Sequence, residues 1–96
     1  ESQVILNGSY NINFTMDLVL KDTGLFNELA KKLNAPLEIS PKVVEIFKDG
    51  KKKYGSRAWS SMIVKRMEDL NNISFRADGF PDELVDNEAE EKGYEI

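Results

Sequence analysis

Apolar residues recur at steps of three and four positions in three separate segments of this chain of 96 residues. This spacing places them on one face of a helix, because an α-helix has about 3.6 residues per turn. The segments are 13–34, 40–54 and 59–70. The sequence therefore predicts an all-α fold, a single domain over 1–96 built as a small bundle of three main helices.

Capping residues and prolines mark the ends of the first two helices. Asn13 is the predicted N-cap of the first, and Pro36 ends it because the residue before a proline avoids the α conformation. Ser40 is the predicted N-cap of the second helix, with Pro41 at its first position, where a missing N–H does no harm. Gly55 is the predicted stop of that helix.

Shorter patterns describe the remaining segments. Residues 1–6 are interpreted as the frayed end of an earlier element, with a loop over 7–12. The third helix is predicted to start near Trp59, whose spacing to later apolar residues indicates a core position, and to break at 71–72. Residues 73–75 are predicted to form a brief strand.

The first helix is apolar on two sides. Its two apolar rows comprise Phe14, Met16, Leu18, Val19, Leu20, Leu25, Phe26, Leu29 and Leu33. We therefore expect burial on more than one side, and association of copies into a homo-oligomer. Gly24 in its middle costs about 1 kcal/mol relative to alanine, and either close packing against another helix or a local bend would explain it.

The chain contains no cysteine and no histidine. Disulfides and thiolate chemistry are excluded, and the commonest general base and metal ligand are missing. Asp17 and Asp22 lie five positions apart on the first helix, a step that turns their carboxylates away from each other. We expect neither a metal site nor catalysis by this chain alone.

No stretch of the sequence has the length and apolar character of a membrane span, and the N-terminus lacks the features of a signal peptide. We therefore expect a cytoplasmic protein without a membrane anchor. The chain starts at Glu1 rather than at a methionine, which favours a start inside a longer polypeptide.

Acidic residues are concentrated at the C-terminus. Residues 78–96 carry eight acids and one base, a net charge of −7, whereas residues 1–77 carry a net charge of +3. We expect an extended acidic arm, which argues against non-specific binding of nucleic acid. The basic cluster 51–53, beside Tyr54 and Arg57, is either a phosphate-binding patch or a solvated helix end favoured by the helix dipole.

Phe14 lies seven positions before the adjacent Lys21 and Asp22. Seven residues make about two helical turns, so Phe14 and Lys21 are predicted to share one helix face. An aromatic ring and a cation on one face can hold a flat ring beside an anionic group. Lys21, in line with leucines, must extend to solvent, pair with Asp17 or Asp22, or face a cleft that holds an anion.

Three segments resemble the C-terminal domain of the β-hydroxyacid dehydrogenases, the 3-hydroxyisobutyrate dehydrogenase family. The first comprises Phe14, Lys21, Asp22, Leu25, Ala30 and Pro36. The second is 54–61, where that family has a Gly-rich turn leading into a Ser-bearing helix, and the third, 79–86, looks like one bacterial branch. The resemblance covers nearly the whole chain.

The resemblance implies a two-domain enzyme. An N-terminal Rossmann-like domain would bind NAD or NADP, and the all-helical C-terminal domain would close the substrate side of the cleft. The reaction would be reversible hydride transfer between the nicotinamide and a small β-hydroxy acid or its semialdehyde. The catalytic lysine of that family lies upstream of this segment, and the G-x-G-x-x-G fingerprint is absent here, so the resemblance implies a fragment that is inactive in isolation.

The resemblance also implies roles for three residues. Lys21 matches the lysine that contacts the cofactor from across the cleft, Asp22 matches the acid that orients it or helps close the site, and Phe14 matches an aromatic near the substrate and nicotinamide. Ala58 stands where relatives often carry an acid, so no particular hydroxy acid is assigned. The alternative function is a free-standing helical dimerisation or interaction module without enzymatic activity.

Overall fold

The computed structural model describes residues 1–81, 89 and 93, and it confirms the all-α prediction. Its elements are α1 (Ser2–Asn7), α2 (Met16–Lys32), α3 (Ser40–Tyr54), the short 3₁₀ helix η1 (Ser60–Met62) and α4 (Ile63–Asn71). Within the described residues the only β-type pairing that is recorded is an isolated bridge between Thr15 and Trp59. The predicted acidic arm falls largely on residues outside those described.

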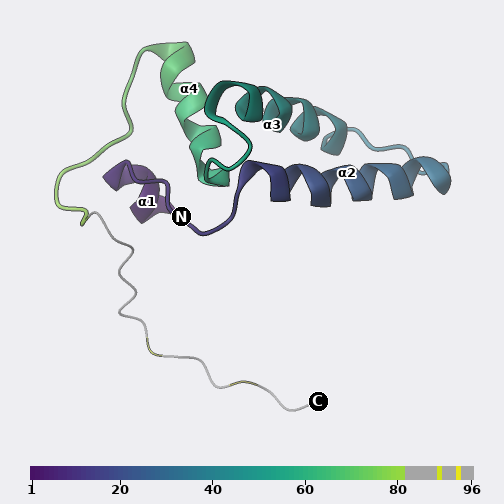
Figure 1. The fold of residues 1–96 in the computed structure, drawn as a ribbon, viewed down its shortest axis with the longest axis horizontal. Helices are drawn as coiled ribbons and strands as arrows, with labels where there is room; N and C mark the ends of the chain where they lie inside the picture. Colours follow the sequence, from purple (N-terminus) through teal and green to yellow (C-terminus); the bar gives the residue numbers. More distant parts are fainter. Residues whose placement is uncertain (82–88, 90–92, 94–96) are drawn as a thin grey trace.

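The helices α2 and α3 form an antiparallel hairpin and pack along each other (Figure 1). The helix α4 crosses the hairpin near the C-terminal end of α3, and α1 packs against η1. Two side-chain hydrogen bonds tie α4 to α3: the Arg66 Nε donates to Asp49 over 2.6 Å, and the Tyr54 hydroxyl donates to Asp69 over 2.7 Å. The result is a bundle with one closed end, where α1, α4 and the start of α2 meet.

The core lies at this closed end, apart from the buried Ala30 near the C-terminal end of α2. Val4, Tyr10 and Met16 are buried, and Met16 is the first residue of α2. Gly50 of α3 is buried there as well, and a Cβ atom at this position would lie 2.8 Å from the Ile63 side chain. The absence of a side chain at Gly50 therefore lets α3 approach α4 and the start of α2 closely.

A buried polar contact accompanies this core. The Tyr10 hydroxyl donates a 2.5 Å hydrogen bond to the Glu68 carboxylate, and both side chains are buried. Burial, reinforced by this hydrogen bond, raises the pKa of Tyr10 to about 12. The contact joins the segment after α1 to α4 across 58 positions of the sequence, and the sequence pattern gave no sign of it.

Several predicted helix ends are confirmed. The helix α2 ends at Lys32, before Pro36, and α3 ends at Tyr54, followed by Gly55 at φ +100°. The N-caps were predicted wrongly. Asn13 has a left-handed φ of 58°, whereas the N-cap of α2 is the extended Thr15.

The predicted cap of the second helix is displaced by one residue. Ile39 occupies the N-cap of α3, and Ser40 is already helical. The Ser40 hydroxyl lies 2.7 Å from the Asn27 side-chain oxygen of α2, so it bonds across the hairpin instead of capping its own helix.

Two short segments also differ from the predictions. Residues 2–7 form the helix α1 rather than a frayed end, because Val4 is fully buried and anchors it. Residues 73–75 form no strand, since no neighbouring segment pairs with them, and Ile73 and Phe75 are exposed. The third helix begins as predicted after Trp59, but through the 3₁₀ turn η1, and Trp59 itself is only half-buried.

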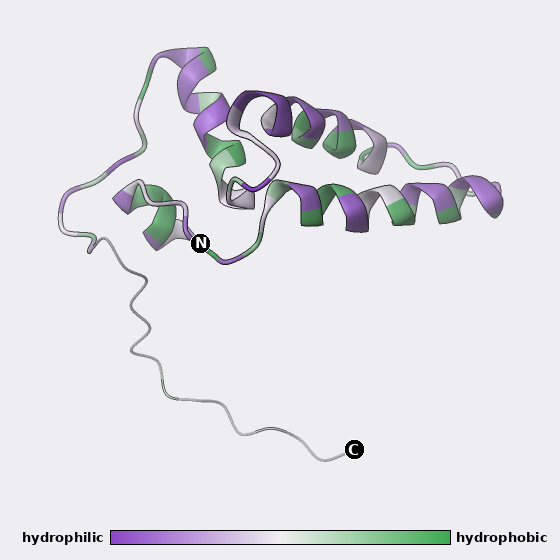
Figure 2. Cartoon of the chain, viewed as in Figure 1, coloured by the Kyte–Doolittle hydropathy of each residue, from purple (hydrophilic) through white to green (hydrophobic). Residues whose placement is uncertain are grey.

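The expected burial of α2 on more than one side is wrong for this chain. Leu25, Phe26, Leu29 and Leu33 are 59%, 54%, 54% and 69% exposed, and Figure 2 shows the hydrophobic stretches along this helix. Among the described residues, only α3 packs along the length of α2, so one side is covered and the other is open. Close packing does not explain Gly24 either, because a Cβ there would meet no atom within 4 Å.

Among the described residues, no helix combines the length and the hydropathy that crossing a membrane requires.

Candidate functional site

The start of α2 is joined to the segment that leads into α4. The two segments form an isolated antiparallel bridge between Thr15 and Trp59. Three backbone hydrogen bonds fix the junction: Met16 N to Ala58 O (2.8 Å), Asp17 N to Ser56 O (3.0 Å) and Ser60 N to Phe14 O (2.6 Å). Two of the segments singled out in the sequence, around Phe14 and over 54–61, are thereby brought together.

The side chain of Asp17 organises this junction. It accepts a hydrogen bond from the Thr15 hydroxyl and another from Arg57 over 3.4 Å. The hydrogen bond from Thr15, assisted by Arg57, holds the pKa of Asp17 below its ordinary value. The sequence pattern placed Asp17 on the first helix but did not predict its pairing with a residue 40 positions away.

Phe14 lies beside a cavity rather than on the face of a helix. It precedes the first residue of α2, so the prediction that it shares a helix face with Lys21 is wrong. It is 37% exposed and lines a cavity of about 530 Å³ with the hydroxyl-bearing Ser60 and Ser61. The apolar members of the lining are Ile12, Val19, Phe47, Ile63 and Val64. Glu1 lines it as well. The Ser61 hydroxyl donates to the Tyr10 carbonyl, so the cavity can hold a small molecule with an apolar body and a polar group facing Ser60.

Lys21 and Asp22 lie on the exposed surface of α2. The Lys21 ammonium is 3.8 Å from the Asp22 carboxylate, and their side chains are 63% and 62% exposed. Such a long and solvated contact contributes little to stability, so neither group is committed to the fold. Neither residue lines the cavity beside Phe14.

The Lys21 ammonium therefore extends to solvent and is loosely paired with Asp22. It does not pair with Asp17, whose carboxylate binds Arg57 instead. The expectation that its face is buried in this chain is wrong, because Leu25 and Leu29 of that face are exposed as well.

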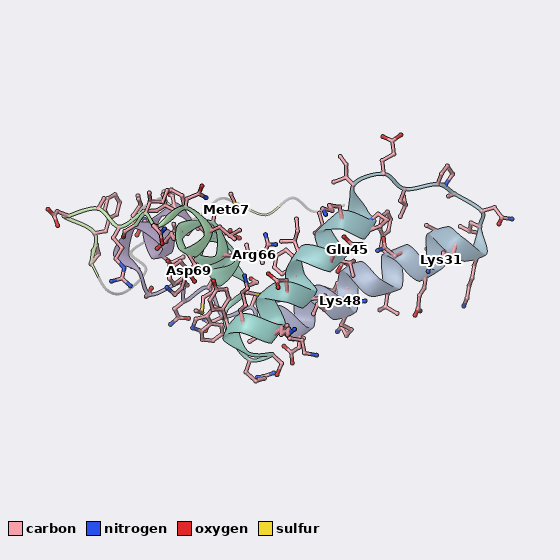
Figure 3. The ribbon with its side chains drawn as sticks, turned by 90° about the horizontal axis from the view of Figure 1, so that it is seen from above. Lys31, Glu45, Lys48, Arg66, Met67 and Asp69 are labelled. Atoms are coloured by element: carbon pink, nitrogen blue, oxygen red, sulfur yellow. The ribbon has the colours of Figure 1, made fainter. Side chains whose placement is uncertain are left out.

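A second hollow lies between α2 and α3. It has a volume of about 480 Å³, and its lining includes Lys31 of α2 and Glu45 and Lys48 of α3, which Figure 3 labels. The basic cluster 51–53 lies at the exposed end of α3, where Lys53 pairs with Asp49 over 3.3 Å. Lys51 of this cluster also lines a hollow of about 430 Å³ together with Lys31 and Lys48. Within the part of the chain that the structure describes, no group of three or more acidic side chains could hold a metal ion.

Comparison with known proteins identifies the family. Residues 2–67 match the family described as "NAD-binding of NADP-dependent 3-hydroxyisobutyrate dehydrogenase". The chain belongs to this family. The matched residues include both segments of the junction and the Lys21–Asp22 pair. The family description bears out the expected cofactor class, NAD or NADP.

A similar curated protein is the 2-(hydroxymethyl)glutarate dehydrogenase of Eubacterium barkeri, which is 33% identical over 70 residues. The match covers 73% of this chain but 23% of that dehydrogenase, so this chain corresponds to a small part of its relative. No solved structure matches the chain significantly.

The family description refines one expectation. The resemblance implied a domain on the substrate side of the cleft, whereas the description assigns NAD binding to the matched segment. The residues of the junction and of α2 therefore belong to a family segment named for its cofactor.

Proposed function

We propose that this chain is the C-terminal domain of an NAD(P)-dependent oxidoreductase that transfers hydride between the nicotinamide and a small β-hydroxy acid or its semialdehyde. The observation that carries this proposal is the family match over residues 2–67. The partner would be an N-terminal Rossmann-like domain, which supplies the dinucleotide fold and the catalytic lysine. The isolated chain would then be inactive, since it carries neither of them.

Lys21 would contact the cofactor across the cleft between the two domains. Its ammonium is exposed on a helix of 17 residues, and its partner Asp22 holds it only loosely. A cation presented in this way can move to a pyrophosphate or ribose oxygen without breaking a buried interaction. Asp22 would orient the lysine or help close the site.

Phe14 would line the substrate and nicotinamide side of the same cleft. It is part-exposed beside a cavity that Ser60 also lines. The aromatic ring can stack against a flat ring, and the Ser60 hydroxyl can hydrogen-bond to a small hydroxy acid, whereas the Ser61 hydroxyl already donates to the Tyr10 carbonyl. The backbone bond from Ser60 to Phe14 fixes the two sides of the cavity relative to each other.

The proposal predicts the effect of Lys21→Ala in the complete enzyme that contains this chain. Loss of one charged contact should weaken cofactor binding by about 10- to 100-fold, because such a contact contributes about 1.5–3 kcal/mol. The dissociation constant is measured by calorimetry with NAD and with NADP. The thermal midpoint should change little, since Lys21 is exposed and loosely paired.

Lys31→Ala is the matched control, because Lys31 is exposed on the same helix but belongs to the hollow between α2 and α3. It should leave cofactor affinity unchanged. Equal affinities for wild type and Lys21→Ala would remove Lys21 from the cofactor site. Full dehydrogenase activity of the 96-residue chain alone would contradict the proposal that a second domain supplies the dinucleotide fold and the catalytic lysine.

A free-standing helical interaction module without enzymatic activity remains the second candidate. The exposed leucines of α2 favour it, because an exposed apolar patch often marks a site of protein–protein interaction. The two candidates differ in the reading frame: an upstream Gly-rich βαβ segment in the same polypeptide supports the enzyme.

A further inference from the structure

The segment between α3 and α4 carries an exposed cation beside the start of α2. Arg57 pairs with Asp17 over 3.4 Å, and its side chain is 78% exposed. No other cation in the ion pairs of the described residues is as exposed. An ion pair in this environment contributes little to stability. The fold therefore depends little on the Arg57 guanidinium, which is accessible to a ligand.

Asp17 brings this cation next to Lys21. The two residues lie four positions apart within α2, so their side chains are neighbours on one side of the helix, with about 5–6 Å between their Cβ atoms. Arg57 is held by Asp17, and Lys21 is held in the same loose way by Asp22 over 3.8 Å. Two exposed cations, each oriented by one carboxylate of α2, therefore lie along the same stretch of this helix.

The junction fixes Asp17 itself. Its backbone N–H donates to the Ser56 carbonyl over 3.0 Å, and its carboxylate accepts hydrogen bonds from the Thr15 hydroxyl and the Leu18 N–H. The carboxylate can therefore hold the Arg57 guanidinium at a defined place relative to α2.

The chemistry of Arg57 suits a phosphate group. A guanidinium has five N–H donors in a fixed fork, and the pair with Asp17 is made through one nitrogen, Nη1. The remaining donors can bind two oxygens of a phosphate in parallel, which the ammonium of a lysine cannot do.

We propose that Arg57 is a second cation of the cofactor site, that it binds a phosphate group of NAD or NADP together with Lys21, and that Asp17 positions it. This inference rests on the proposed function, because it takes the ligand to be the dinucleotide. Each phosphate of a dinucleotide carries negative charge, so a guanidinium beside the Lys21 ammonium adds to the charge complementarity of the site.

Arg57→Gln in the complete enzyme tests the contact. We expect the dissociation constant of the cofactor, measured by calorimetry, to rise by about 10- to 100-fold, as for the loss of one charged hydrogen bond. Arg57→Lys keeps the charge without the fork and should recover part of the affinity. Lys42→Gln is the matched control, because Lys42 is also an exposed cation in a single ion pair, and it should leave the affinity unchanged.

Titrations with both cofactors identify the phosphate. Equal losses of affinity for NAD and NADP would assign Arg57 to the pyrophosphate, which the two cofactors share. A loss confined to NADP would assign it to the 2′-phosphate. Unchanged affinity for both cofactors in Arg57→Gln would overturn the inference.

Asp17→Asn separates a direct contact from an effect on the junction. If Arg57 binds the cofactor, Arg57→Gln should weaken binding in the Asp17→Asn background as well. If Arg57 acted only through its pair with Asp17, the second substitution would change nothing further, and this result would overturn the direct contact. The thermal midpoint of Arg57→Gln should stay close to that of wild type, since the pair is exposed.

The variant Lys21→Ala keeps the two proposals apart. Weaker cofactor binding in Lys21→Ala together with unchanged binding in Arg57→Gln would reject the second cation and leave the role of Lys21 in place. Unchanged binding in both variants would reject both roles.

Discussion

The hydrogen bond between Tyr10 and Glu68 is the buried polar contact on which the closed end of the bundle depends. A buried carboxylate without a donor is costly, and the Tyr10 hydroxyl supplies a donor over 2.5 Å. The backbone carbonyl of Tyr10 in turn accepts a hydrogen bond from the Ser61 hydroxyl, so the same residue also holds η1 in place. A single tyrosine thus joins the segment after α1 to both η1 and α4.

Replacing this tyrosine tests the contact. Tyr10→Phe should lower the free energy of unfolding by about 1–3 kcal/mol, because it leaves the Glu68 carboxylate buried without this partner. Urea denaturation measures the change. Tyr54→Phe is the control, since the bond from Tyr54 to Asp69 is exposed and its loss should cost less. Equal losses for both variants would contradict the special role of the buried pair.

Because the pKa of Tyr10 is raised, its contribution to the free energy of unfolding depends on pH. A group whose pKa is higher in the folded state contributes stability below its unfolded value, near pH 10, and that contribution is lost as the pH rises towards about 12. Tyr54 has a pKa raised to about 12 and acts in the same direction. Part of the alkaline loss of stability should therefore remain in Tyr10→Phe and disappear only in the double variant.

At the scale of the elements, two glycines inside helices differ in their packing: one lies against other side chains and the other faces open space. Gly50 of α3 lies against the side chains of Ile63 and Met16, so the close approach of three helices depends on it. Gly24 of α2 has open space where a side chain would be. The sequence shows both as mid-helix glycines with the same intrinsic cost, and only the packing separates them.

A pair of substitutions measures this difference. Gly24→Ala should raise the free energy of unfolding by about 0.5–1 kcal/mol, because it adds helix propensity without a clash. Gly50→Val should lower it by about 1–3 kcal/mol, because the new methyl groups overpack the contact with Ile63. Thermal or urea unfolding gives both values. A stabilising Gly50→Val would show that α3 is free to move away from α4.

At the scale of the whole molecule, three carboxylates hold the elements together. Asp17 joins α2 to Arg57, and Asp49 and Asp69 join α3 to α4. The Thr15 hydroxyl lowers the pKa of Asp17, the Arg66 guanidinium that of Asp49, and the Tyr54 hydroxyl that of Asp69. All three shifts have the same direction, so they add in their effect on stability.

Acid should therefore weaken the fold. A carboxyl group whose pKa is lowered in the folded state contributes stability above its unfolded value, near pH 4, and this contribution is lost as the pH falls through the folded value. Urea denaturation from about pH 6 down to about pH 3 should show a falling free energy of unfolding. Asp49→Asn should make the decline shallower. A free energy that stays constant over this range would contradict the assignment.

The sequence by itself determined the helical class, the ends of two helices and the family. These features are local: a period of 3.6, a proline after α2, a glycine after α3 and the order of short motifs can each be recognised without neighbours in space. The cofactor class followed from the same motifs. Lys21 and Asp22 were placed correctly on a helix, although their roles remain predictions.

The tertiary structure alone decided where α2 begins, which glycine is packed and which leucines are exposed. The start of α2 is set by backbone bonds to residues about 40 positions away, and no local pattern encodes such pairing. Periodicity likewise shows that a face of α2 is apolar but not what covers it. Burial depends on the other helices present. Of the helices that the structure describes, only α3 lies along α2, which leaves Leu25 and Leu29 exposed.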